Sequence, residues 1–120
     1  MTTHATITRY FGAIHKGGWE ALVTDDFVFV NSNLDTVAHG KQAYLEGAGR
    51  FYRGSTAVEI RQLLIDGNRA AILARYQMRT PKGHTGVCDV AEFLTIDGDK
   101  LSSSAIFFDT KALADLMARE

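Results

Sequence analysis

The sequence predicts an α+β fold in which helices cover one face of a curved antiparallel sheet. Two patterns lead to this prediction. Apolar residues follow helical spacing in residues 4–23 and 41–52, and from residue 56 onward they alternate or form continuous runs, as is typical of strands. Short turns at residues 66–68, 80–83 and 96–100 join these strands, and short turns impose antiparallel neighbours.

The first helix is expected over residues 4–16. Its apolar residues lie at i, i+3, i+4 and i+7 and therefore form one stripe: Ile7, Tyr10, Phe11 and Ile14. Either Thr2 or Thr3 can cap its start, and the glycines at positions 17 and 18 end it. A short second helix is expected over residues 19–23, with a turn after it at residues 24–26.

The middle of the chain is expected to hold a short strand, a loop and a third helix. The strand covers residues 27–30 and the loop residues 34–40. The helix covers residues 41–52, where Tyr44, Ala48, Phe51 and Tyr52 share one face. Gly47 and Gly49 weaken this helix by about 1 kcal/mol each relative to alanine, or they allow a close backbone contact.

The remaining strands are expected at residues 57–65, at residues 69–80 and on both sides of the turn within residues 87–109, with one or two helical turns at 111–119. In the strand after Gly86 neither face is clearly polar. One face carries Asp89, Ala91, Phe93 and Thr95, and the other carries Cys88, Val90, Glu92 and Leu94. A sheet that is apolar on both faces needs a cover beyond its own helices, and a second copy of the chain is the simplest one. We therefore expect a homodimer.

The composition predicts one soluble domain spanning residues 1–120, with 46% hydrophobic and 22% charged residues. The net charge of −1 gives no bulk attraction to nucleic acid, and no stretch approaches the roughly 18 apolar residues of a membrane span. The N-terminus lacks the features of a signal peptide, so a cytoplasmic location is expected. Cys88 is the only cysteine, and His39 and His84 lack metal-ligand spacing, so neither a disulfide nor a metal site is expected.

Four segments resemble the nuclear transport factor 2-like superfamily, which includes ketosteroid isomerase and the SnoaL-like polyketide cyclases. These segments are TRYFGAIHKGGWEAL, TDDFVFVN, HGKQAY and AEFLTIDGDKLSSSAIFFD. The resemblance covers nearly the whole chain. It implies a cystatin-like, cone-shaped sheet with the N-terminal helices on its concave face. The superfamily holds isomerases, cyclases, dehydratases, epoxide hydrolases and non-catalytic binders, so the resemblance implies a fold more than an activity.

The resemblance also implies site residues. Tyr10 matches the tyrosine that donates to the substrate oxyanion in ketosteroid isomerase. Asn31 stands where the isomerase has its general base, and Ala91 stands where it has a protonated aspartic acid. Asparagine cannot take a proton from carbon and alanine cannot donate one, so ketosteroid isomerase activity itself is not expected. The aspartate–arginine–aspartate set of the epoxide hydrolases is not matched either, because no arginine lies between Asp89 and Phe108.

Asp89 is the main candidate for chemistry, because it lies two residues before Ala91 and faces the same way. SnoaL-like cyclases use an aspartate near this place. Burial in an apolar cone would raise the pKa of Asp89 and suit it to acid or base catalysis near neutral pH. Alternatively, it is a structural carboxylate bonded to Tyr10, Tyr76 or a backbone amide, or it lies at a dimer surface.

Two further residues complete the predicted catalytic set. Asn31 can donate to a carbonyl or orient a water, or it supports the end of its strand. Tyr10 can donate to an oxyanion, or it is a core residue of its helix. The walls of a small-molecule pocket are expected to include Tyr76, Met78, Ile106 and Phe108, which would equally fill an ordinary core.

Two functions follow from these candidates. The first is a SnoaL-like protein that binds a small apolar molecule and acts without a cofactor, as an isomerase, cyclase or lyase that moves a proton. The second is a non-catalytic ligand-binding or dimerisation module of the same fold. They differ in whether Asp89 points into an open cavity within hydrogen-bond range of Asn31 or Tyr10.

Overall fold

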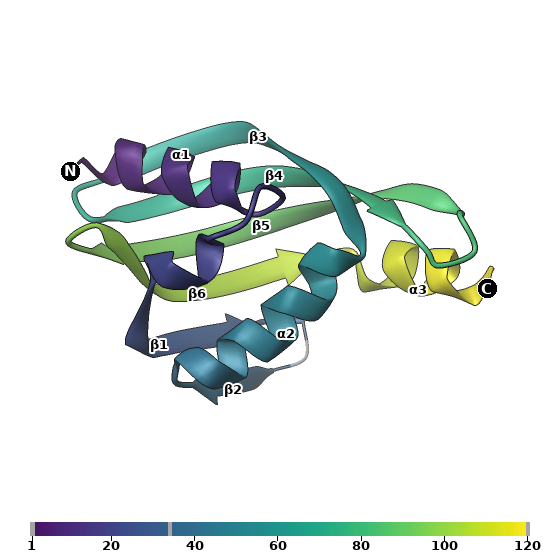
Figure 1. Ribbon diagram of the computed structural model, residues 1–120, viewed down its shortest axis with the longest axis horizontal. Helices are drawn as coiled ribbons and strands as arrows, with labels where there is room; N and C mark the ends of the chain where they lie inside the picture. Colours follow the sequence, from purple (N-terminus) through teal and green to yellow (C-terminus); the bar gives the residue numbers. More distant parts are fainter. Residues whose placement is uncertain (1, 34, 120) are drawn as a thin grey trace.

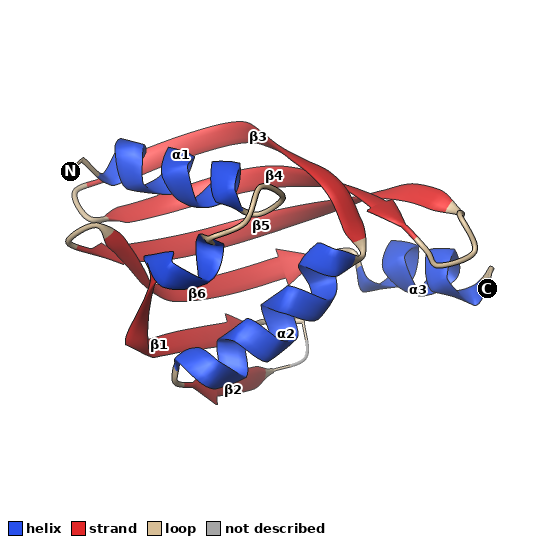
Figure 2. Cartoon of the chain, viewed as in Figure 1, coloured by secondary structure: helices blue, strands red, loops and turns tan. Residues whose placement is uncertain are grey.

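The elements follow one another in nearly the predicted order in this computed structural model, which describes residues 2–33 and 35–119 (Figures 1 and 2). In chain order they are α1 (Thr3–Ala13), the short 3-10 helix η1 (Trp19–Leu22), β1 (Val23–Asn31), β2 (Thr36–His39), α2 (Lys41–Arg53), β3 (Ser55–Asp66), β4 (Arg69–Arg79), β5 (Thr85–Asp97), β6 (Lys100–Phe108) and α3 (Thr110–Ala118). Helices α1, η1 and α2 lie against one face of a curved sheet, so the predicted α+β arrangement is confirmed (Figure 1).

The strands form one sheet in the order β2-β1-β6-β5-β4-β3. The hairpins that link β3 to β6 are antiparallel, as their short turns predict. However, β1 runs parallel to β6, so the sheet is mixed and the prediction of a wholly antiparallel sheet is wrong in this pair. The reason is that no tight turn joins β1 to β6. Because most of the chain lies between them, local turn chemistry sets no direction for this pair.

Strand β2 replaces part of the predicted loop at residues 34–40. It pairs antiparallel with β1, from Val28 opposite His39 to Asn31 opposite Thr36, while residue 34 lies outside the described residues. The strand has one large aliphatic side chain, Val37, which is 55% exposed, so no buried alternation marks it in the sequence. Strand β1 itself begins at Val23 and includes the predicted turn at 24–26, where its pairing with β6 is irregular.

Helix α1 has the predicted cap and the predicted buried stripe. The Thr2 side chain accepts a hydrogen bond from the backbone N–H of Ala5 at 3.1 Å. Ile7, Tyr10 and Phe11 are buried against the sheet, and the helix ends at Ala13, three residues earlier than expected. None of the described helices has the length and apolar character that crossing a bilayer requires.

The alternation along β5 decides which side chains face the helices. Cys88, Val90, Glu92 and Leu94 are buried on the concave face. Asp89 and Phe93 are exposed on the opposite, outer face. The sequence predicts this division into two faces but not which of them is inside. As a result, the carboxylate within the cone is Glu92.

Candidate functional site

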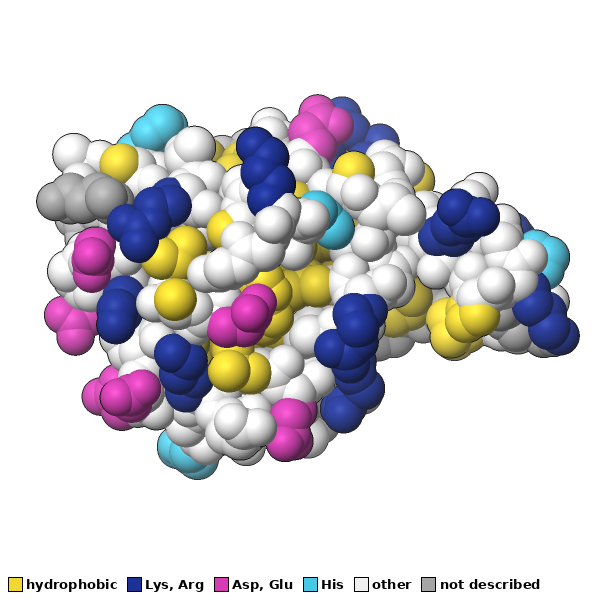
Figure 3. Space-filling view, viewed as in Figure 1, with side chains coloured by type: hydrophobic (Ala, Val, Ile, Leu, Met, Phe, Trp, Pro, Cys, Tyr) yellow, Lys and Arg dark blue, Asp and Glu magenta, His cyan; other side chains and the backbone are white. Residues whose placement is uncertain are grey.

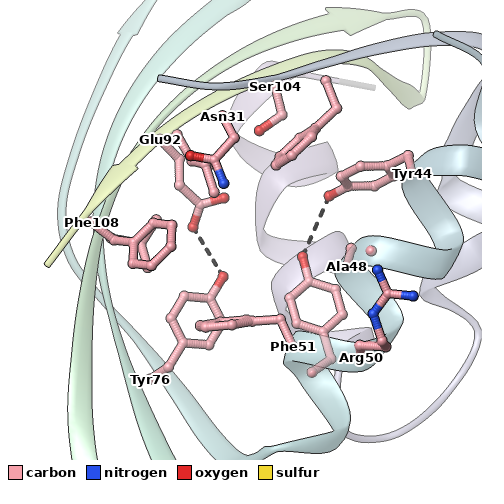
Figure 4. A pocket seen from close by; sticks show the side chains of 14 residues that line it. Asn31, Tyr44, Ala48, Arg50, Phe51, Tyr76, Glu92, Ser104 and Phe108 are labelled. Atoms are coloured by element: carbon pink, nitrogen blue, oxygen red, sulfur yellow. Dashed lines mark hydrogen bonds between the residues drawn. The ribbon is translucent and has the colours of Figure 1, made fainter. Parts of the chain in front are cut away.

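A cavity of about 250 Å³ lies between α2 and the concave face of the sheet (Figure 4). Strands β1, β4, β5 and β6 form one wall and α2 forms the other. The lining residues are Phe29, Asn31, Tyr44, Gly47, Ala48, Arg50, Phe51, Tyr52, Tyr76, Val90, Glu92, Ser104, Ile106 and Phe108. Most of these side chains are apolar or aromatic, and a few polar groups converge between them. This combination is typical of a small-molecule site.

Glu92 is the acid of this cavity. It lies on β5 between Ile72 of β4 and Ile106 of β6, and only 5% of its surface is exposed. The hydroxyl of Tyr76 donates to Glu92 Oε2 at 3.0 Å (Figure 4). Burial raises the pKa of Glu92 to about 7, although the Tyr76 hydrogen bond acts in the opposite direction. The carboxyl is therefore divided between its neutral and charged forms near neutral pH.

Two polar groups of the cavity lack a hydrogen-bond partner among the described residues. They are Asn31 Oδ1 and Ser104 Oγ, and both are buried. Asn31 pairs with Ile106, the residue that also pairs with Glu92, so Asn31 and Glu92 lie two strands apart in one row of the sheet. Leaving a buried polar atom without a hydrogen bond costs about 1–3 kcal/mol of stability. A ligand with a hydroxyl or a carbonyl group could provide the hydrogen bonds that these two atoms lack.

Three tyrosine hydroxyls meet behind the cavity. The Tyr10 hydroxyl is 2.7 Å from that of Tyr44 and 2.8 Å from that of Tyr52, and these two are 3.5 Å apart. Burial raises the pKa of Tyr44 to about 12 and raises the pKa values of Tyr10 and Tyr52 well above their ordinary value. Tyr44 and Tyr52 line the cavity, but Tyr10 does not. The Tyr10 hydroxyl is thus bonded to two other tyrosines within the core, in agreement with the alternative that Tyr10 is a core residue of its helix.

The structure places Asp89 away from this cavity. Its two carboxylate oxygens accept hydrogen bonds from Arg75 at 2.8 and 3.0 Å on the outer face of the sheet. The side chain of Asp89 is 45% exposed, and the Arg75 hydrogen bonds lower its pKa. The expected position inside the cone is therefore incorrect, and so is the expected rise in pKa. The physical reason is the two-residue period of the strand, which sends odd-numbered positions of β5 outward at this point.

The other predicted residues divide into two groups. Asn31, Tyr76, Ile106 and Phe108 line the cavity. Met78 lies one step beyond it, in a neighbouring groove near α3. The structure thus brings Asn31 together with three of the four predicted wall residues, and it separates all of them from Asp89.

Glu92 and Ser104 are the site residues that sequence reasoning missed. A signal for Glu92 exists in the sequence, because Glu92 is the one charged residue in the otherwise apolar row Cys88, Val90 and Leu94. Ser104 has no such signal, since it lies in the run Ser102-Ser103-Ser104, where only the sheet register distinguishes its members.

The donor set does not suggest a metal centre. Within residues 2–33 and 35–119, no group of three or more His, Cys, Asp or Glu side chains is placed to hold a metal ion. The cavity offers one carboxyl, one amide and several hydroxyls, with the exposed Arg50 at its rim. Such a set can bind oxygen atoms of an organic ligand and move a proton to or from it.

Comparison with known proteins places the chain in a family. The SnoaL-like domain model matches residues 7–104, whereas a search of curated proteins finds no significant match. A proposed SnoaL-like polyketide cyclase from Shewanella denitrificans is similar in structure, with a TM-score of 0.79, 16% identity and 98% of each chain covered. A protein with a ketosteroid isomerase-like fold from Catenulispora acidiphila, in complex with trimethylamine, has a TM-score of 0.75 and 15% identity, over 94% of this chain and 92% of its own.

A third similar structure is TerC co-crystallised with polyporic acid. Its TM-score is 0.77 at 16% identity, over 97% of this chain and 98% of its own. At these identities the structures show a shared fold. Together with the family match over residues 7–104, they confirm both the predicted resemblance and the predicted fold. The chain belongs to the SnoaL-like domain family.

Proposed function

We propose that this protein binds a small, mostly apolar molecule in the cavity and moves a proton on it, as an isomerase, cyclase or lyase that needs no cofactor. The observation that carries the proposal is the buried Glu92 carboxyl, whose pKa is raised to about 7 and which shares a cavity with two unpaired polar groups. A base with such a pKa is half in its reactive form at neutral pH, where general acid–base catalysis is most efficient.

The geometry supports a specific division of roles. The charged carboxylate of Glu92 takes a proton from a carbon next to a carbonyl group, and the bonding electrons move to the carbonyl oxygen to form an enolate. The hydroxyl of Ser104 donates to that oxygen, while Asn31 Oδ1 accepts from a hydroxyl of the substrate. The neutral Glu92 then returns the proton to another atom of the substrate. Tyr76 steadies the carboxylate through its hydrogen bond.

The cavity volume limits the substrate. At about 250 Å³ it lies just below the roughly 300–1,000 Å³ of most ligand pockets. One or two fused rings with a ketone and a hydroxyl group suit this space better than a four-ring skeleton. The proposal therefore names a small cyclic ketone or hydroxyketone as the substrate class.

The test is hydrogen–deuterium exchange at the α-carbon of small cyclic ketones, such as tetralones and indanones, followed by NMR in D₂O. We expect the protein to accelerate exchange and Glu92→Gln to reduce the acceleration by about 10²–10⁴-fold, the usual contribution of a positioned base. Asp89→Asn is the matched control, because it changes the outer-face acid while leaving the cavity intact. A Glu92→Gln variant as active as the parent would overturn the proposal.

A second candidate function is a non-catalytic ligand-binding module. The observation that favours it is the Tyr76 hydrogen bond, which already occupies one oxygen of Glu92. This candidate predicts that the same ketones bind, with chemical-shift changes at Ser104 and Asn31, but that their α-protons exchange no faster than in buffer. The exchange experiment therefore separates the two functions.

A further inference from the structure

A second depression adjoins the cavity at the C-terminal end of α2. This basic groove, of about 480 Å³, lies between α2, the end of β4 and α3. Three arginines line it, Arg50, Arg53 and Arg79, and its apolar floor includes Met78, Leu113 and Leu116. In Figure 3, Lys and Arg side chains gather beside α2, and hydrophobic side chains are visible between them and α3.

The charge of this groove is not balanced locally. No Asp or Glu occurs among its described lining residues, and within the described part of the chain none of its three arginines forms an ion pair. The whole chain has 13 basic and 14 acidic residues, so a groove with three arginines and no acid departs from the average surface. Such a groove attracts anions.

The groove and the cavity share a border. Arg50 lines both of them, and all three arginines are exposed. The backbone N–H of Arg79 donates to the carbonyl of Gly54 at 2.8 Å, which fixes the end of β4 beside the end of α2. The sheet thereby holds Arg79 and Arg53 on neighbouring segments, one step outward from the cavity.

We propose that the basic groove binds the anionic end of the molecule whose ring occupies the cavity. The ligand class is a small ring system that carries a carboxylate or phosphate on a flexible apolar arm. Guanidinium groups pair with both anions through two parallel hydrogen bonds, and Met78, Leu113 and Leu116 provide an apolar surface for the arm. This inference rests on the proposed function for the position of the ring but not on proton transfer by Glu92.

The test uses naphthyl ethers that differ only at the end of a six-carbon arm: a carboxylate, a phosphate monoester or a primary alcohol. Fluorescence titration at low ionic strength measures their affinities. We expect each anion to bind about fivefold more tightly than the alcohol, which is the effect of an exposed ion pair, and we expect added salt to reduce this preference. The stronger of the two anions identifies the charged group that the groove prefers.

The variant Arg53→Ala/Arg79→Ala removes two of the three arginines and keeps Arg50, which also lines the cavity. Its preference for the anions over the alcohol should therefore fall to about twofold or less. The matched control is Arg61→Ala/Arg69→Ala, which removes the same charge from residues that line neither the cavity nor the groove. Equal binding of anion and alcohol by the parent, or an undiminished anion preference in Arg53→Ala/Arg79→Ala, overturns the inference. A parent protein that prefers the anions and yet fails to accelerate the exchange of ketone α-protons is a further outcome. That combination supports anion binding in the groove and contradicts only the proposed catalysis.

Discussion

Glu92 is a buried acid whose ionisation opposes folding. Its pKa is about 7 in the folded protein against an ordinary value of 4.5. Between these two pH values the native state holds a proton that the unfolded state has released. The free energy of unfolding therefore falls as pH rises through this window, by about 3 kcal/mol in total, at 1.36 kcal/mol for each unit of pKa difference.

Replacing Glu92 with glutamine should abolish this pH dependence, because glutamine keeps a polar, neutral side chain of similar size. We expect the variant to gain stability relative to the parent between about pH 4.5 and pH 7, and to keep an advantage of about 3 kcal/mol above that range. Urea denaturation at several pH values measures the difference. Glu59→Gln, on an exposed position of β3, is the control. Parallel stability curves for the Glu92 variant and the parent would show that Glu92 ionises normally.

The limit of sequence reasoning at the residue scale is visible at Asp89 and Glu92. The two-residue period of a strand separates them onto opposite faces, and the structure agrees. The inner face could not be identified, because Ala91 and Phe93 make the outer face as apolar as the inner one. Asn31 is proposed from the family resemblance, and its side chain lines the cavity.

Helix α2 shows that two similar glycines in one element have different surroundings. A Cβ on Gly49 would lie 3.2 Å from Arg53 Nη1 and 3.9 Å from the ring of Trp19, so this position allows the close contact expected from the sequence. A Cβ on Gly47 would meet nothing within 4 Å. Gly47 therefore contributes only the conformational cost of glycine in a helix.

Gly47→Ala should raise the free energy of unfolding by about 1 kcal/mol, because alanine restricts the unfolded chain and enters open space. Gly49→Ala is the matched variant and should gain less, since the Arg53 side chain has to move away. Thermal and urea denaturation of both variants measure the difference. A Gly47 variant no more stable than its Gly49 counterpart would contradict this interpretation.

At the scale of elements, the sequence predicts those helices and strands that are determined by residues close together in the chain. The capped, striped helix α1 and the hairpins from β3 to β6 follow from side-chain spacing and turn residues. Strand β2 and the parallel pairing of β1 with β6 depend on partners distant in the chain, and they leave no periodic signal of their own. The cavity forms where these long-range pairings meet α2. The family resemblance indicates Asn31, and the strand faces indicate Tyr76, Ile106 and Phe108. Neither locates Glu92 or Ser104.

At the scale of the whole molecule, the sheet has an apolar surface on its outer face as well as on the concave face that the helices cover. The strand register aligns Leu64, Ala71, Phe93, Ala105 and Val30 in one row across five strands. Leu64 is 71% exposed and Phe93 is 62% exposed. In a dimer with a two-fold axis through this row, the row of one subunit packs against the same row of the other. This contact would bury the exposed apolar side chains. We therefore retain the prediction of a homodimer and assign its contact to this outer face.

Phe93→Arg should convert this dimer into a folded monomer. Burying a phenylalanine contributes about 1.5–3 kcal/mol, and a two-fold contact loses this amount twice while bringing two arginines together. The fold should persist, because the Phe93 side chain points away from the core and its neighbours Leu94 and Glu92 remain buried. Met117→Arg, at a similarly exposed position on α3 and outside this row, should leave the dimer intact. Sedimentation velocity measures both variants. A parent protein that sediments as a monomer, or a Phe93→Arg variant that stays dimeric, would exclude this face as the interface.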